Sequence, residues 1–156
     1  MLKVPKSAGV LMFRERDGLE VLLIHPGGPF WRKKDDGAWS IPKGEFTSAE
    51  EPLAAARREF EEELGAPVTG EFSPLGTIQQ SGGKTVFAWA VRGEFDPATL
   101  KSNTFLVEWP PKSGRQKEFP EVDRAGWYAI PAARVKLLPA QTAFLDRLIE
   151  HIGGSA

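Results

Sequence analysis

In the first third of the chain, runs of apolar residues are separated by short polar segments, and this pattern predicts paired strands. The segments SAGVLMFRE (7–15) and GLEVLLIH (18–25) meet at Arg16-Asp17-Gly18, which is a hairpin turn signal. The segment AWSIPKGEF (38–46) predicts a short strand that runs into a turn containing proline and glycine. Further strands are predicted at about 75–80, 85–92, 104–108 and 125–130, with a polar, proline-rich loop, PPKSGRQKEFPEVDR, between the last two.

In two segments the apolar residues recur at spacings of three and four, which is the period of an α-helix. From about residue 49 to 64 the apolar stripe is Leu53, Ala56, Phe60 and Leu64. Start and stop signals flank this helix: a capping box from Thr47 or Ser48 with Glu50 or Glu51, Pro52 in the first turn, and Gly65 at the end. A second helix, AQTAFLDRLIEHI, closes the chain after Pro139.

Strands clustered around two separated helices predict an α/β or α+β layer fold, with helices packed on a mixed sheet. A length of 156 residues suits one domain, 1–156. The 20 basic and 21 acidic residues give a net charge of −1, which does not favour a nucleic-acid or membrane-surface protein.

Cysteine is absent from the composition, which excludes disulfides, thiolate catalysis and cysteine-type zinc sites. The two histidines, His25 and His151, are far apart, so a histidine-rich metal site is not expected, and His25 is predicted to be structural. No stretch reaches transmembrane length and the first residues contain no long apolar segment, so we expect a cytoplasmic protein.

Three glutamates of the first predicted helix share one stripe. Glu59, Glu62 and Glu63 stand at i, i+3 and i+4, next to the apolar stripe, whereas Glu61 points elsewhere. Like charges at this spacing repel one another, and a hard divalent cation such as Mg²⁺ would relieve that repulsion. The spacing alone leaves two interpretations open, a metal site and an ordinary solvated helix face.

The residues upstream favour the metal site. From Gly44 the chain reads GEFTSAEEPLAAARREFEEELGA, which resembles the signature of the Nudix hydrolase family, G-x5-E-x7-R-E-U-x-E-E-x-G-U, where U is a bulky apolar residue. All seven fixed identities match: Gly44, Glu50, Arg58, Glu59, Glu62, Glu63 and Gly65. Ala66 at the last position is smaller than the usual aliphatic residue, which affects packing rather than chemistry.

The resemblance implies an α/β/α sandwich that uses Mg²⁺ or Mn²⁺ to hydrolyse a nucleoside diphosphate linked to another moiety. The metal-binding carboxylates of the family correspond to Glu59, Glu62 and Glu63, and the backbone carbonyl of Lys43 often joins them. Gly44, Glu50, Arg58 and Gly65 correspond to residues that support the loop and helix.

A further carboxylate of the family comes from a late loop, ahead of a strand that carries tryptophan. Glu121 is our candidate, with Glu118 and Asp123 as alternatives, and an interpretation of all three as simple loop charges stays open. The general base corresponds either to Glu59 or to this late glutamate.

The candidates for substrate binding lie outside the Nudix signature, which runs from Gly44 to Ala66. The entry W-x-x-P-K-G resembles that of family members acting on nucleoside and dinucleoside polyphosphates, which puts Lys43 beside the phosphates. Lys84 could aim a second cation at phosphate or simply be solvated, and Phe30 and Trp31 could stack a nucleobase or pack on the sheet. The other tryptophans, Trp39, Trp89, Trp109 and Trp127, are expected in the core.

The predicted substrate is therefore a nucleoside or dinucleoside polyphosphate, a small molecule bound by a monomer or homodimer, with no nucleic-acid or membrane partner. The alternatives are a house-cleaning pyrophosphatase for dNTPs, nucleotide sugars or ADP-ribose, and a nucleotide-sensing Nudix module without catalysis. A sensor would be expected to lose glutamates of the box, and none is missing here.

Overall fold

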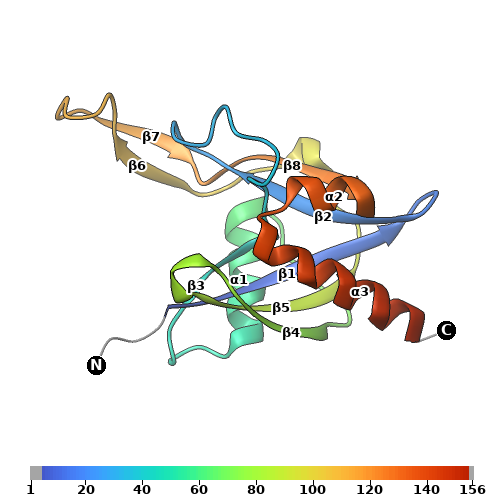
Figure 1. Ribbon diagram of the computed structural model, residues 1–156. Coiled ribbons are helices and arrows are strands. Elements are labelled where there is room, and N and C mark those ends of the chain that lie inside the picture. Colours follow the sequence, from blue (N-terminus) through green and yellow to red (C-terminus); the bar gives the residue numbers. More distant parts are fainter. Residues whose placement is uncertain (1–4, 155–156) are drawn as a thin grey trace.

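The computed structural model describes residues 5–154, which form a mixed sheet between helices and a smaller sheet beside it (Figure 1). The six-stranded sheet has the order β4-β5-β1-β2-β8, and β3 pairs with β1. Only β1 and β5 are parallel; the other neighbours are antiparallel. The strands of the large sheet are β1 Lys6–Glu15, β2 Leu19–Pro26, β3 Lys43–Phe46, β4 Ser73–Gln79, β5 Thr85–Arg92 and β8 Val122–Ala129. The small sheet pairs β6 Thr104–Glu108 with β7 Gln116–Pro120.

Three α-helices cover the large sheet, α1 Pro52–Leu64, α2 Ile130–Lys136 and α3 Thr142–Gly154, and three single 3-10 turns lie at Ser81–Gly83, Pro97–Thr99 and Pro139–Gln141. Alternate residues of β1 and β2 enter two separate cores, because side chains along a strand point to opposite faces. Val10 and Leu22 pack with Phe60 of α1, whereas Leu11 and Leu23 pack with α3. The predicted sandwich of helices around a mixed sheet is confirmed.

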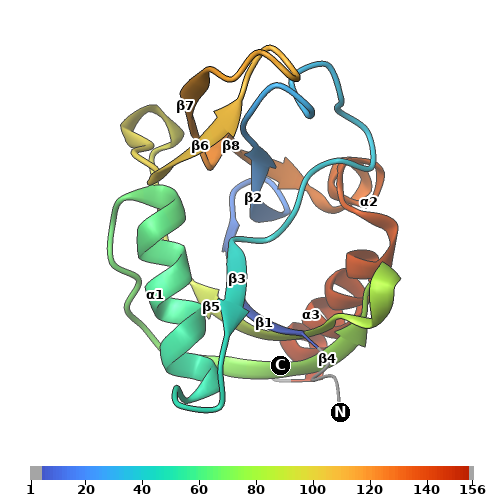
Figure 2. The same ribbon diagram turned by 90° about the vertical axis from the view of Figure 1, so that its left-hand side faces the viewer.

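Strand β1 pairs with β3 through its first residues and with β2 through its last residues, and this arrangement positions the candidate active site described below. Its first residues, Lys6–Gly9, pair with β3, and its last residues, Phe13–Glu15, pair with β2. A Cβ at Gly9 would lie 2.5 Å from the carbonyl oxygen of Pro42, so glycine allows β3 to approach closely. The segment that contains Lys43 and Gly44 is thereby held against the sheet opposite α1 (Figure 2).

Several details differ from the sequence-based expectations. The strand of the 38–46 segment is β3, Lys43–Phe46, which covers the residues expected to turn. Neither β7 nor α2 was predicted from the sequence. Strand β7 pairs only with β6 and is largely exposed, so it lacks the alternation of apolar residues found in a strand that packs on the core. No helix in residues 5–154 is long and apolar enough to cross a membrane.

The predicted capping box is wrong. Helix α1 begins at Pro52, and its N-cap residue Glu51 makes no side-chain capping bond. Glu50 instead accepts from Arg58, eight residues further on, so its carboxylate is not available as a cap. The predicted stop is confirmed, because Gly65 takes a left-handed conformation (φ +83°) and its N–H donates to the carbonyl of Glu61.

Candidate active site

Arg58, on the polar face of α1, forms hydrogen bonds to three glutamates. Its Nε and Nη2 donate to the two carboxylate oxygens of Glu50 at 2.8 and 2.9 Å. Its Nη1 donates to Glu59 at 2.9 Å and to Glu62 at 3.2 Å. These bonds raise the pKa of Arg58 and lower that of Glu50. One guanidinium thus links the loop before the helix to two of the three striped glutamates.

Glu63 lies against the start of β3. The backbone N–H of Lys43 donates to its Oε1 at 3.0 Å. Burial nevertheless raises the pKa of Glu63 to about 8, because the single hydrogen bond and the nearby Lys43 charge only partly compensate for lost solvation. Burial also raises the pKa of Glu59, and the charge of Glu62 adds to this effect.

Gly44 is required by the position of Glu59. A Cβ at residue 44 would lie about 2.0 Å from the carboxyl carbon of Glu59, so this side chain rests directly on the glycine backbone. The contact explains why the turn after Lys43 carries no side chain and fixes the carboxylate between β3 and α1.

Glu121 follows β7 and shares the electrostatic environment of the helix carboxylates. Burial raises its pKa, and the negative charge of Glu62 raises it further, while Glu121 in turn raises the pKa of Glu59 and Glu63. Of its two sequence alternatives, Asp123 accepts from the ring of buried His25 at 2.8 Å, and Glu118 lies exposed on β7. The structure therefore brings Glu121, rather than these two, to the helix glutamates.

Two lysines border the carboxylates. Burial lowers the pKa of Lys43, and the neighbouring positive charge of Lys84 lowers it further, against the opposite influence of Glu63, Glu45 and Glu59. Lys84 itself lies 3.8 Å from Glu45 of β3. A pair of cations beside a cluster of carboxylates suits a ligand that carries both phosphate and metal.

The aromatic candidates lie on the loop between β2 and β3. Phe30 is 62% exposed and Trp31 is half-buried under the ammonium of Lys34, 5.0 Å from its ring. Of the tryptophans expected in the core only Trp39 is buried, whereas Trp89, Trp109 and Trp127 are half-buried. Trp89 and Trp127 nevertheless pack against the core that contains Phe60, so the expectation is wrong only for Trp109, which follows β6 and contacts Phe30.

Backbone bonds of Asn103, which the sequence did not single out, tie Glu121 to α1. Its N–H donates to the carbonyl of Glu62 at 2.9 Å, and its carbonyl accepts from the N–H of Glu121 at 2.8 Å. A cavity of about 560 Å³ lies beside this bridge and Glu62, lined by Arg58, Glu61, Glu62, Gly65, Lys101, Ser102 and Asn103. Backbone bonds of this kind leave no signal in a sequence.

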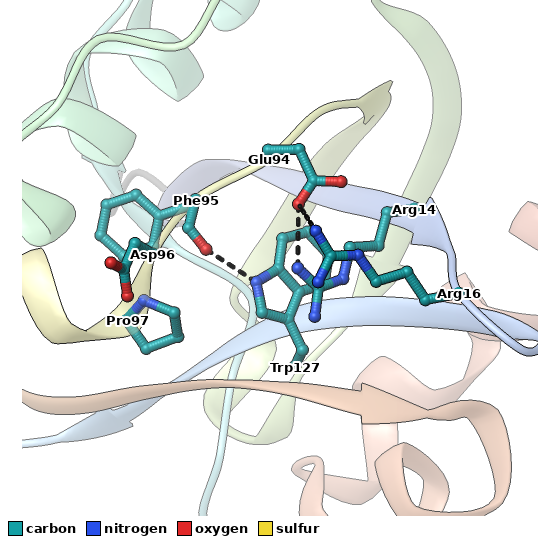
Figure 3. Close-up of a pocket in the computed structure, with 7 residues that line it drawn as sticks. All are labelled: Arg14, Arg16, Glu94, Phe95, Asp96, Pro97 and Trp127. Atoms are coloured by element: carbon teal, nitrogen blue, oxygen red, sulfur yellow. Dashed lines mark hydrogen bonds and ion pairs between the residues drawn. The ribbon is translucent and has the colours of Figure 1, made fainter.

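Another cavity, of about 480 Å³, lies at the opposite end of β1 and is lined by Arg14, Arg16, Glu94, Phe95, Asp96, Pro97 and Trp127 (Figure 3). Arg14 stacks over Trp127 at 4.0 Å and donates to Glu20 and Glu94, and Arg16 lies 3.6 Å from Glu94. The charges of this cavity are largely paired with one another.

The donor set of the glutamate cluster fits a hard divalent cation, which prefers carboxylate oxygens. Within residues 5–154 no three acidic or histidine side chains are spaced for joint coordination, and Arg58 donates to both Glu59 and Glu62. Coordination of a metal would therefore require these carboxylates to exchange the guanidinium for the ion.

Fold and site together define a hydrolase of phosphoanhydrides. The family model of the NUDIX domain matches residues 3–151, so the chain belongs to the Nudix family of pyrophosphohydrolases, which typically use a divalent metal ion. A comparison with curated proteins found no match.

Solved structures share the fold at low sequence identity. An Ap4A hydrolase binary complex from C. elegans is 20% identical, with 97% of this chain and 99% of that chain covered and a TM-score of 0.66. The NUDIX domain of Shewanella oneidensis NrtR, complexed with ADP ribose, is 14% identical, with 97% and 90% covered and a TM-score of 0.66. A MutT structure, from a study of Aliivibrio salmonicida and Vibrio cholerae, is 18% identical, with 94% and 96% covered and a TM-score of 0.54.

Proposed function

We propose that this protein, as a single domain, hydrolyses a phosphoanhydride bond in a nucleoside or dinucleoside polyphosphate with the help of Mg²⁺ or Mn²⁺. The observation that carries the proposal is a set of contacts between neighbouring segments: Arg58 donates to both Glu59 and Glu62, the N–H of Lys43 donates to Glu63, and the backbone of Asn103 joins Glu62 to Glu121. These contacts bring the four carboxylates near the charges of Lys43 and Lys84.

The four carboxylates and the backbone carbonyl of Lys43 would hold the metal. When bound, the ion neutralises phosphate charge and lowers the pKa of a water molecule that attacks phosphorus. Lys43 and Lys84 bind the phosphate oxygens, since two ammonium groups offset the charge that repels the attacking water. Phe30 and Trp31 supply the aromatic surface for a nucleobase.

Glu121 is the better general base of the two candidates. Glu59 is held by Arg58 at 2.9 Å, whereas the side chain of Glu121 forms no hydrogen bond or ion pair within the described part of the chain. Burial raises its pKa, and a carboxylate with a higher pKa is a stronger base. Gly44, Glu50, Arg58 and Gly65 support the arrangement without contacting the substrate.

In this proposal the enzyme is cytoplasmic and acts as a monomer or homodimer on a free nucleotide. Its alternatives, dNTPs, nucleotide sugars and ADP-ribose, differ from the proposed substrates in the group attached to the diphosphate, so one screen separates them. A nucleotide sensor would bind one of these compounds without cleaving it.

The test is a phosphate-release screen with Mg²⁺ and Mn²⁺ over dNTPs, diadenosine polyphosphates, ADP-ribose and nucleotide sugars. Glu62→Gln should lower kcat at least about 100-fold, because a lost ligand costs several kcal/mol of charge stabilisation. Glu61→Gln is the matched control, one residue away on the exposed side of α1. Hydrolysis that survives equally in both variants would contradict the proposed site, and nucleotide binding without any hydrolysis would favour a sensor.

A further inference from the structure

The loop Gly27–Gly37 and the hairpin of β6 and β7 form one projecting unit, which we call the arm (residues 27–37 and 104–120). The ring of Phe30 meets the ring of Trp109 edge-on at 5.8 Å, and a Cβ at Gly28 would lie 2.9 Å from the ring of Phe105. Figures 1 and 2 show the hairpin standing away from the large sheet with the loop beside it.

The arm is joined to the candidate active site by the backbone at its base. Strand β7 ends one residue before Glu121, whose carbonyl accepts from the N–H of Gly27 at 2.9 Å. The hairpin pairs from Thr104↔Pro120 at the base outward. Trp109 is five residues from Thr104, which at a strand rise of 3.4 Å puts it about 17 Å further out.

Large apolar side chains of the arm are exposed to an unusual degree. Phe30 is 62% exposed, Leu106 64% and Phe105 37%, three of the five exposed large apolar side chains of the described chain. Leu106 lies on the opposite face of the hairpin from Phe105, because successive side chains of a strand alternate in direction. Single exposed apolar residues need no explanation, but the exposed ring of Phe30 in contact with Trp109 indicates a binding surface.

The arm is also positively charged. It carries six basic residues, Arg32, Lys33, Lys34, Lys112, Arg115 and Lys117, against four acidic ones, a net charge of +2, while the whole chain is at −1. Within residues 5–154 none of the six forms an ion pair, whereas two of the acidic residues, Asp35 and Asp36, are paired with Lys136 of α2. Unpaired cations among aromatic rings suit a ligand with phosphates and a nucleobase.

We infer that the arm binds the distal nucleoside and phosphates of a dinucleoside polyphosphate, with the nucleobase stacked on the exposed ring of Phe30 and flanked by the perpendicular ring of Trp109. This inference rests on the proposed function and selects one substrate class within it. The arm lies beyond the carboxylates, so what it binds is the end of the substrate remote from the attacked phosphorus. One aromatic pair serves one base, whereas proteins that follow a single-stranded RNA offer successive stacking platforms and a more basic surface.

The test compares equilibrium binding of diadenosine tetraphosphate and of ATP by calorimetry, with Phe30→Leu and Trp109→Leu as variants. Each variant should raise the Kd for the dinucleotide about 10-fold, the effect expected of one lost stacking contact, and should raise the Kd for ATP much less. Lys112→Gln/Arg115→Gln/Lys117→Gln should weaken the salt dependence of dinucleotide binding, because fewer cations face the phosphates.

Two control variants outside the arm test whether the change in nucleotide affinity is specific to the arm. Ile149→Ala removes an exposed apolar side chain of α3, and Arg134→Gln removes an exposed cation of α2; both should leave the two Kd values unchanged. Thermal unfolding of each variant checks that the fold is retained.

An equal loss for both nucleotides, or no loss for either, would overturn the inference. Tighter, arm-dependent binding of a 5′-triphosphorylated oligoribonucleotide would overturn it in favour of RNA. A wild-type dimer that Phe30→Leu dissociates, measured by light scattering, would assign the surface to a second copy. If the dinucleotide binds through the arm but is not cleaved, the proposed function fails while the inference about the arm stands.

Discussion

The Arg58 guanidinium binds the Glu50 carboxylate through two parallel hydrogen bonds, from Nε at 2.8 Å and from Nη2 at 2.9 Å. The same group reaches Glu59 and Glu62 through Nη1. The pair with Glu50 therefore decides how strongly Arg58 competes with a cation for the two helix carboxylates.

Glu50→Gln should lower the free energy of unfolding slightly, because a bidentate ionic bond is lost from a partly exposed position. It should also raise the Mg²⁺ concentration for half-maximal activity several-fold, since Arg58 then pairs more tightly with Glu59 and Glu62. Urea unfolding and a Mg²⁺ titration measure the two effects. Asp146→Asn, which breaks the more exposed pair with Arg134, is the control. Equal behaviour of the two variants in the titration would contradict this role of Arg58.

Glu63 makes the stability of the protein in EDTA depend on pH. Its pKa is about 8 in the folded chain and near 4.5 in the unfolded chain, so between these values the folded state holds one proton more. The free energy of unfolding should therefore fall as pH rises from about 4.5 to 8, by at most about 1.4 kcal/mol per pH unit from this group. The raised pKa values of Glu59 and Glu121 act in the same direction.

Denaturant unfolding in EDTA across pH 4.5 to 8.5 measures this dependence, with Glu63→Gln in parallel. The variant keeps the shape of the side chain but does not titrate, so its stability should fall less steeply and exceed that of the wild type at pH 8. Identical slopes for the two proteins would show that Glu63 ionises normally.

The carboxylate of Glu59 depends on the absence of a side chain at residue 44. In Gly44→Ala the new methyl group would overlap the carboxyl group of Glu59, which must move away from the site. A displacement of about 1 Å is enough to lower kcat about 100-fold. Gly153→Ala is the control, because a Cβ there meets nothing within 4 Å. Kinetics with the screened substrate and a melting curve measure the result; full activity of Gly44→Ala would exclude Glu59 from the reaction.

The parts of the molecule that sequence analysis predicted well are those where one residue type is required for a local reason. The continuous apolar runs of β1 and β2 follow from burial on both faces, and the spacing of Glu59, Glu62 and Glu63 follows from the helical period. Gly44 and Gly65 each stand where a Cβ would collide with a neighbour.

The parts that it missed depend on contacts between distant segments. Strand β7 exists because β6 pairs with it, although its own residues are polar. Trp109 was expected in the core and instead meets Phe30 across 79 residues of sequence. Glu50 satisfies the capping pattern but pairs with Arg58, because a bidentate ionic bond outweighs a single cap.

His25 fastens the base of the arm to the sheet. It is fully buried, with Nδ1 2.8 Å from Asp123 Oδ1 and Nε2 2.6 Å from the carbonyl of Lys34. Both partners are hydrogen-bond acceptors, and each ring nitrogen lies within hydrogen-bond distance of one of them. The side chain thereby connects β2 to β8 and to the loop that carries Phe30.

His25→Gln should therefore loosen the loop and lower the free energy of unfolding by about 2 kcal/mol, less than for a fully buried pair because Asp123 is 28% exposed. Trypsin should cleave faster after Arg32, Lys33 and Lys34, since the carbonyl of Lys34 loses its donor. The rate of cleavage under native conditions measures this, with His151→Gln on the exposed side of α3 as the control. If the two variants are cleaved at the same rate, the loop is held by the bonds of Asp35 to Trp39 and Lys136 rather than by His25.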